Sequence, residues 1–468
     1  MRKSIDALLL FILVIARIRI DTLADLVLPQ RHEDVRRLVA NWWPEASLAL
    51  LSDWLSDPVT QILVSLAFGL TLLYMAVDAA EPRLGHPTTY RLKLGLIYAI
   101  IIVLVLGKTT LLIGLRHITG PAAYTHDGGV IQTESTVEFF LDGKSPYIEN
   151  YLDTPMAEWG IEYRTALYHY PYLPWTFIFS APFYLLSHLS LGWYDQRFVY
   201  LLLFLLTLGL AQGLARQQTH KLMAVMLIGL NPIMASDVIF GQNDSFILFW
   251  LVLAMWLMQK AEHSRSSRKW QLGGAVIFGL ACASKPTAWF LAPFWFLYLL
   301  REQWGTGLIP SPARWLALAQ TLWRRTWPLA VVMVVVVGPW FVWNPDAMID
   351  DVWRWSAGTA EHHYQIRGWG LSNFILALQL VPDRLAYWPF WLTEIIIAGP
   401  LLLLGLWRQV RYNTISQMLY NYTVLLFGFF YASRFLNENY LGYLAAFLAL
   451  AFIISADEAD AEPTTPRT

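Results

Sequence analysis

The chain has 468 residues, of which 56% are hydrophobic and only 14% are charged. Soluble globular proteins carry about 25% charged residues, so this composition excludes several soluble domains and favours a multi-pass α-helical membrane protein. The net charge of −1 argues against a nucleic-acid-binding surface. The single cysteine, Cys282, excludes a disulfide scaffold and a cysteine-based zinc site.

Apolar segments predict an all-α fold with about 11 to 14 transmembrane helices in one integral-membrane domain, residues 1–455. Clear spans are expected near 59–81, 93–115, 197–212, 221–233, 245–259, 271–283, 287–300, 327–343, 388–406, 415–431 and 438–455, and weaker ones near 174–190 and 371–381. Residues 1–22 predict a span or an interfacial helix, and the mixed segment from about 22 to 58 predicts an amphipathic surface segment. We divide the domain into extra helices (1–92), a central module (93–300) and C-terminal helices (301–455), followed by a disordered tail (456–468).

The distribution of Lys and Arg predicts which loops face the cytoplasm. Three basic segments are expected there: 260–269, 301–326 and 408–411. Four other segments then face the extracytoplasmic side, the first of them a long acidic loop: 118–172, 234–244, Lys285 and 344–370. The basic turn at 216–221 fits this alternation only if the apolar segment 174–190 does not cross the membrane.

The acidic loop predicts a short amphipathic helix on the outer membrane surface. Ser135 and Glu138 have the spacing of a capping box, and Gly143 suits a C-terminal cap. The loop acids Glu134 and Glu138 are expected to be solvated. This segment provides the first large outer loop of the predicted fold.

Asp127 is the strongest catalytic candidate in this loop. It lies where the preceding span meets the loop, and Gly128 and Gly129 let the backbone turn sharply after it. A carboxylate at this depth can act as general base beside a substrate whose head group lies in the same plane. The alternative is that Asp127 only caps the next turn.

Two further polar segments are candidates for substrate binding. His169 and Tyr170 begin the sequence HYPYLP, which predicts an interfacial re-entry, and His169 can reach a sugar or phosphate unless it is simply an interfacial histidine. An apolar helix is expected to end at Asn231-Pro232 and another to start after Asp244. Between them, the turn GQND offers the donors and acceptors that sugar hydroxyls need, although Asp244 can also serve as a helix cap. Its candidates are Gln242, Asn243 and Asp244.

Cationic groups on the predicted outer face suit a lipid phosphate. Lys285 interrupts two apolar spans, where an unpaired charge is costly, with snorkelling to the interface as the alternative. His362 and Arg367 lie in the outer loop 344–370. We expect no metal there because the adjacent residues His362 and His363 point apart. Lys108 is a further buried cation without an evident partner.

The order of these motifs resembles the GT-C superfamily of integral-membrane glycosyltransferases. An early Asp in the outer loop is followed by a GKSPY turn, a Tyr/Pro re-entry, Asn-Pro ahead of GQND, and a break containing Lys, over residues 93–300. The order is most similar to the branch with the GPI mannosyltransferase catalytic subunits and bacterial polyprenol-phosphate-mannose-dependent mannosyltransferases. The central module is therefore expected to be GT-C-like.

The resemblance implies a polyprenyl-phosphate sugar donor, transfer with inversion on the extracytoplasmic face, and Asp127 as general base. His126 lies where many members have a second acid, and Gln242 and Asp244 match the polar cluster after Asn-Pro. A late polar patch of the family is matched by Asn437, Glu438 and Asn439.

The expected function is thus transfer of a hexose, with mannose favoured, from a polyprenyl-phosphate donor to a lipid-linked or glycan acceptor at the plasma or inner membrane. No cofactor and no nucleic acid are expected, and a divalent metal is not indicated. The alternative function is a polytopic transporter or a flippase for lipid-linked sugars, although such proteins often show repeated halves and midplane charges. A non-catalytic membrane scaffold is a second alternative.

Overall fold

The computed structural model describes residues 5–27, 31–40, 42, 44, 57–158, 165–264, 266–304 and 312–461, with no side chain described at 18–32, 127, 263, 304, 312–313 or 460–461. The predicted all-α fold is confirmed. In the described part of the chain, the strands are β1 (Arg367–Gly368) and β2 (Phe435–Leu436), which pair in parallel. Within the described residues, six helices are long and apolar enough to span a membrane, or seven if one bent pair is a single span.

The described part of residues 5–119 contains long helices together with shorter ones. Its elements are α1 (Ile5–Val27), α2 (Arg31–Val39), α4 (Pro58–Ala79), α5 (Glu81–Leu84), α6 (His86–Ile101), η1 (Ile102–Gly107) and α7 (Lys108–Thr119). The last three form one candidate span, and α4 packs along α6. Lys108 does have partners: its Nζ lies 3.7 Å from Asp57 Oδ2 and donates to Thr60 Oγ1.

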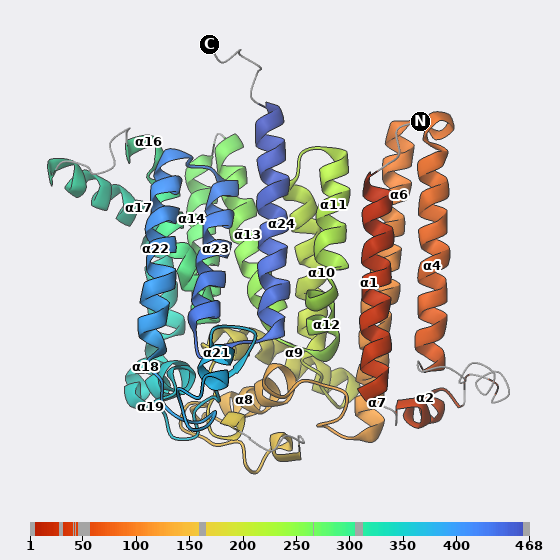
Figure 1. Cartoon of the computed structure of the whole chain (residues 1–468), viewed down its shortest axis with the longest axis horizontal. Coiled ribbons are helices and arrows are strands. Elements are labelled where there is room, and N and C mark those ends of the chain that lie inside the picture. Colours follow the sequence, from red (N-terminus) through yellow and green to blue (C-terminus); the bar gives the residue numbers. More distant parts are fainter. Residues whose placement is uncertain are drawn as a thin grey trace.

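Short helices follow at the lower end of the bundle in Figure 1: η2 (Asp127–Ile131), α8 (Gln132–Leu141), η3 (Pro155–Glu158), η4 (Thr165–Leu167) and α9 (Trp175–Leu191). The predicted surface helix is confirmed as α8, but it continues directly from η2, so Ser135 is buried within it and caps nothing. Gly143 does end it, with φ +72°.

Segment 174–190 does not cross the bundle. Arg116 at the end of α7 forms a 2.9 Å ion pair with Asp195, which precedes the next long helix. Everything between these two residues, α9 included, therefore starts and ends at the same end of the molecule. This removes the conflict in the predicted alternation of loops, because the basic turn near 216 then lies at the opposite end.

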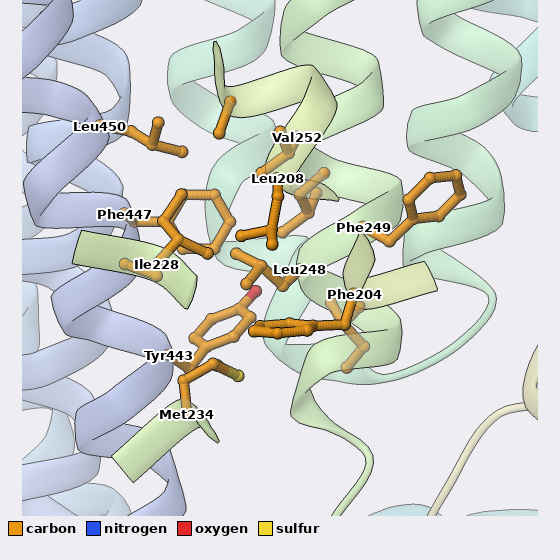
Figure 2. Packing of buried hydrophobic residues seen from close by; sticks show 14 of the residues in the cluster. Phe204, Leu208, Ile228, Met234, Leu248, Phe249, Val252, Tyr443, Phe447 and Leu450 are labelled. Carbon is orange, nitrogen blue, oxygen red and sulfur yellow. The ribbon is translucent and has the colours of Figure 1, made fainter. Parts of the chain in front are cut away.

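The central helices are α10 (Arg197–Leu214), α11 (Gln218–Gly229), α12 (Pro232–Phe240), α13 (Asp244–His263), α14 (Ser267–Cys282), η5 (Pro286–Leu291), α15 (Ala292–Leu299) and α16 (Arg301–Trp304). One helix ends just before Asn231-Pro232, as predicted. The irregular segment expected after it is instead the helix α12, because the Asn231 side chain accepts from Ile233 N and Met234 N and caps that helix. α11 and α12 form a pair bent by 50°, so the polar turn shrinks to residues 241–243. Figure 2 shows the core between α10, α13 and the last helix, where Phe204, Leu248 and Phe447 meet.

The C-terminal elements are α17 (Pro312–Val336), α18 (Gly338–Trp343), α19 (Pro345–Ile349), η6 (Asp350–Arg354), α20 (Trp355–Ala357), α21 (Ser372–Ala377), α22 (Phe390–Arg411), α23 (Ile415–Ala432) and α24 (Glu438–Ala461). The weak span expected at 371–381 is wrong, because only the six-residue α21 forms there. Helix α24 extends past the expected start of the tail at 456, since Asp457 is buried and accepts from the backbone of Arg216 and from His220. Residues 462–468 of that tail lie outside the described residues.

Candidate active site

Two turns predicted separately from the sequence lie in backbone contact. His126 N donates to Phe240 O at 2.9 Å, which joins the start of the acidic loop to the turn after α12. A Cβ on Gly129 would lie 2.0 Å from Gly241 O, and Gly241 itself has φ +88°. Only glycine permits such an approach and such a backbone conformation. The glycines after Asp127 and the glycine of GQND thus bring the two turns together.

Lys285 joins these turns through Asp244. Its Nζ lies 2.8 Å from Asp244 Oδ1, and Asn439 Nδ2 donates to the other carboxylate oxygen. Lys285 Nζ also lies 5.7 Å from the ring centroid of Tyr172 and 5.2 Å from that of Tyr440. The cost of burying Lys285 is therefore met by one carboxylate and two aromatic faces.

A cavity of about 1480 Å³ lies against this cluster. Its polar end includes His126, Gly128, Gly129, Gln132, Tyr172, Gln242, Asn243, Lys285, Arg367, Asn437, Glu438 and Asn439. Its apolar part runs along η5, α22 and α23 and includes Trp289, Phe290, Trp391, Ile395, Leu402 and Phe429. Trp391 and Ile395 are 54% and 62% exposed on candidate span α22. The cavity therefore connects a charged end with the surface that faces lipid.

The structure brings several predicted site residues to this cavity. His126, Gln242, Asn243, Lys285 and Arg367 line it. Asp244 lies behind Lys285 as its ion-pair partner. The Asp127 side chain lies outside the described residues, but its backbone begins η2 between two lining residues, His126 and Gly128.

His169, Tyr170 and His362 are not among the lining residues. His169 Nδ1 lies 2.8 Å from Asp351 Oδ1, and its Nε2 lies 2.6 Å from Glu361 O. Tyr170 N donates to Asp351 Oδ2, and the His362 ring stacks on Tyr168 at 3.9 Å. These three residues thus hold the loop 344–370 against the first loop.

Burial raises the pKa of Asp351 to about 6, although His169 and Tyr170 N oppose this shift. Burial lowers the pKa of His169, but the Asp351 and Glu361 contacts outweigh it and raise that pKa above its ordinary value. His169, Asp350 and Asp351 also have the spacing of metal ligands. This trio does not line the cavity, and the expected absence of a metal stays a prediction.

Glu134 was expected to be solvated, but the structure shows that it is not. It lies in a buried network in which Arg116 Nη2 is 2.6 Å from Glu134 Oε2 and Arg197 Nη2 is 2.7 Å from Asp195 Oδ2. Burial opposes ionisation of Asp195, yet the guanidinium groups of Arg197 and Arg116 lower its pKa to about 2. The network fixes the start of α8, because Arg197 Nη1 also donates to Tyr124 O.

Sequence reasoning missed Gln132, Tyr172 and Tyr440 in the cavity wall. Gln132 looked like an ordinary helix residue, and tyrosines are too frequent in this chain for one of them to stand out. Lys285 could have indicated the two tyrosines, because a buried cation is stabilised by nearby aromatic rings or carboxylates.

Comparison with known proteins agrees with the sequence resemblance. The model of the dolichyl-phosphate-mannose-protein mannosyltransferase family matches residues 195–343, which is less than half of the chain. A search of curated proteins found no match. Among solved structures, ArnT from Cupriavidus metallidurans in the apo state is 19% identical with a TM-score of 0.44.

The ArnT alignment covers 78% of this chain, which spans 60% of the ArnT chain. The family model covers α10 to α18, including the GQND turn and Lys285. The family match confirms the predicted resemblance over this part of the chain: residues 195–343 of this multi-pass membrane protein are similar to a GT-C glycosyltransferase family.

Proposed function

We propose that this protein transfers a hexose, with mannose favoured, from a polyprenyl-phosphate donor to a lipid-linked or glycan acceptor on the extracytoplasmic face. The observation that carries the proposal is the single cavity that joins a lipid-facing apolar wall to a charged end. A polyprenyl donor is too apolar to leave the bilayer, so its chain needs such a wall and its phosphate needs cations at the interface. The family match over 195–343 supports the same class of donor.

The two lining cations have different partners. Lys285 is already paired with Asp244. The structure gives the Arg367 guanidinium no carboxylate partner among the described residues, and the side chain is exposed in the cavity wall. We therefore assign the lipid phosphate to Arg367, whose planar fork suits bidentate phosphate binding. Lys285 adds positive potential and orients Asp244.

The transfer itself is an in-line displacement. The acceptor hydroxyl oxygen forms a bond to C1 of the sugar while the bond from C1 to the phosphate oxygen breaks, and the configuration at C1 inverts. The electron pair leaves with the lipid phosphate, where Arg367 stabilises the negative charge. Asp127 takes the hydroxyl proton.

His126 lies on the same wall and has a defined tautomer when neutral. Its Nδ1 accepts from Gly129 N at 3.4 Å, so the ring proton is on Nε2. Nε2 is therefore the donor atom of the neutral ring, and we assign the proton transfer itself to Asp127.

The test is transfer by detergent-purified protein from radiolabelled polyprenyl-phosphate mannose to a panel of glycolipid and glycan acceptors. The proposal expects release of polyprenyl phosphate that depends on acceptor and on Asp127. Flip of the labelled lipid in proteoliposomes without any cleavage would instead support a flippase, and absence of both activities would support a scaffold.

A further inference from the structure

Gln132 has an orientation that its contacts determine without ambiguity. It is fully buried, and its Nε2 donates to Ala166 O at 2.6 Å and to His169 O at 2.8 Å. An amide nitrogen has two hydrogens, and two carbonyl groups use both. Exchanging nitrogen and oxygen would place Oε1 against two carbonyl oxygens, so the oxygen must point the other way.

The Gln132 Oε1 atom receives no hydrogen bond from the residues that the structure describes. It lies at the glycine end of the cavity, because a Cβ on Gly128 would be 3.5 Å from it and 3.1 Å from the Tyr172 hydroxyl oxygen. A Cβ at Gly128 would be crowded by the Tyr172 hydroxyl, so the glycine keeps this end of the cavity beside Oε1 free of a further side chain. A buried carbonyl oxygen without a donor is destabilising, so its retention in a cavity wall points to a ligand that donates.

A second amide oxygen lies on the other side of the same turn. Gln242 Oε1 is also buried without a donor within the described residues. A Cβ on Gly129 would lie 3.0 Å from the Gln242 Cα, so the two glutamines flank the glycine pair. Both residues line the cavity near Lys285.

We infer that Gln132 and Gln242 form the subsite for the donor sugar, in which each amide oxygen accepts from one sugar hydroxyl. This inference rests on the proposed function, and it locates the sugar ring at the glycine end while the lipid chain lies along α22. Gln132 is the specificity-determining residue, because its two structural bonds prevent its amide from rotating to suit a different sugar.

The first experiment measures binding rather than turnover. Undecaprenyl phosphate and undecaprenyl-phosphate mannose are titrated into purified full-length protein, and tryptophan fluorescence reports the two dissociation constants. We expect the sugar to tighten binding about tenfold or more in the wild type, a 1.4 kcal/mol difference. Gln132→Met removes the acceptor at similar size and should abolish this gain while sugar-free lipid binds as before.

Two controls keep the result interpretable. Gln409→Met changes a fully buried glutamine that is bonded to Asn413 and Asn421 and does not line the cavity, so the sugar-dependent gain should remain. Gln242→Met changes the second acceptor at a half-buried position where no side-chain hydrogen bond is broken, so it tests the subsite even if Gln132→Met does not fold. Mannose donors that each lack one hydroxyl then identify the bonded position. In each variant, removing the hydroxyl that would have donated to the missing amide oxygen should not weaken donor binding further.

The outcomes separate this inference from the proposed function. Equal binding of both lipids by the wild type, or equal weakening of both by Gln132→Met and Gln242→Met, overturns the sugar subsite. Sugar-dependent binding with no transfer to any acceptor supports the subsite and overturns the transferase.

Discussion

The helices α1, α4 and α6 also enclose charged side chains, and Lys93, Asp6 and Asp78 there are bonded to one another. Lys93 Nζ lies 2.7 Å from Asp6 Oδ2 and also pairs with Asp78, while the Tyr74 hydroxyl donates to Asp6 at 2.6 Å. Arg17 Nη1 donates to Ser236 Oγ at 2.6 Å, which links α1 to α12.

At the cavity the pairing is incomplete. Two amide oxygens have no donor, and Arg367 has no carboxylate, within the described residues. Buried polar groups in native proteins are usually hydrogen-bonded, so the closed Lys93 cluster fits a structural role, whereas unpaired groups that also line a cavity fit contact with a ligand. The following substitutions test this contrast.

Asp127→Asn should have the largest effect on chemistry, because general-base assistance contributes about 10² to 10⁴ in rate. We expect kcat for transfer to fall by that range while donor binding is retained. Glu138→Gln is the matched control, since Glu138 lies on the same loop, is exposed, and accepts from the hydroxyl of the half-buried Tyr184. Wild-type turnover in Asp127→Asn, or inactivity of Glu138→Gln, would assign the base elsewhere in the loop.

Lys93→Met should have the largest effect on stability. Removing one partner of a buried pair costs about 3–5 kcal/mol because the remaining charge is left unpaired. Thermal unfolding in detergent should reveal this loss, whereas KM for the donor, measured well below the melting temperature, should stay unchanged. The paired double variant Lys93→Met with Asp6→Asn should recover part of the stability; a selective rise in KM would contradict a purely structural role.

Arg367→Gln should have the opposite effects from Lys93→Met: donor binding should weaken while stability is retained. Hydrogen bonds to charged groups contribute about 1.5–3 kcal/mol, so we expect donor affinity to fall roughly tenfold to a hundredfold, with little change in stability. Binding of undecaprenyl phosphate at two salt concentrations measures this effect. Arg354→Gln is the control, because its guanidinium pairs with Asp346 and Asp350 outside the cavity lining. Equal losses in the two variants would remove Arg367 from the phosphate site.

The sequence predicted the all-α membrane fold, the helix α8 and the Lys285 and GQND segments, because hydropathy and glycine or proline signals are local. It did not predict the continuation of the chain as α12, because Asn-Pro was interpreted only as the end of one helix, whereas Asn231 as N-cap and Pro232 at the first helical position also start the next one. The buried position of Glu134 depends on Arg116 and Asp195, which are distant in sequence. Contacts such as Lys285 with Asp244 are likewise tertiary, so spacing alone could not reveal them.

The contact between the first loop and the loop 344–370 should weaken as pH rises. The pKa of Asp351 is raised from its ordinary 3.8 to about 6, chiefly by burial, and that of His169 is raised by its contacts with Asp351 and Glu361. A group with a raised pKa stabilises the closed contact at low pH, and this stabilisation is lost as pH passes through the raised value. Loss of a proton from Asp351 and from His169 therefore weakens the contact in both cases. Asp350, 3.7 Å from His169, adds a second carboxylate to the pair.

We expect hydrogen-exchange protection factors in residues 344–370, corrected for intrinsic exchange, to fall about tenfold between pH 5 and 7, which corresponds to one pKa unit. Asp351→Asn keeps acceptor and donor atoms but removes the titrating carboxyl, so its profile should be flatter. His363→Gln is the control, because the His363 ring nitrogens bond the backbone carbonyls of Ala360 and Leu385, away from the Asp351 pair. Protection that rises with pH, or an unchanged slope in Asp351→Asn, would show that the loops are held together by groups other than this pair.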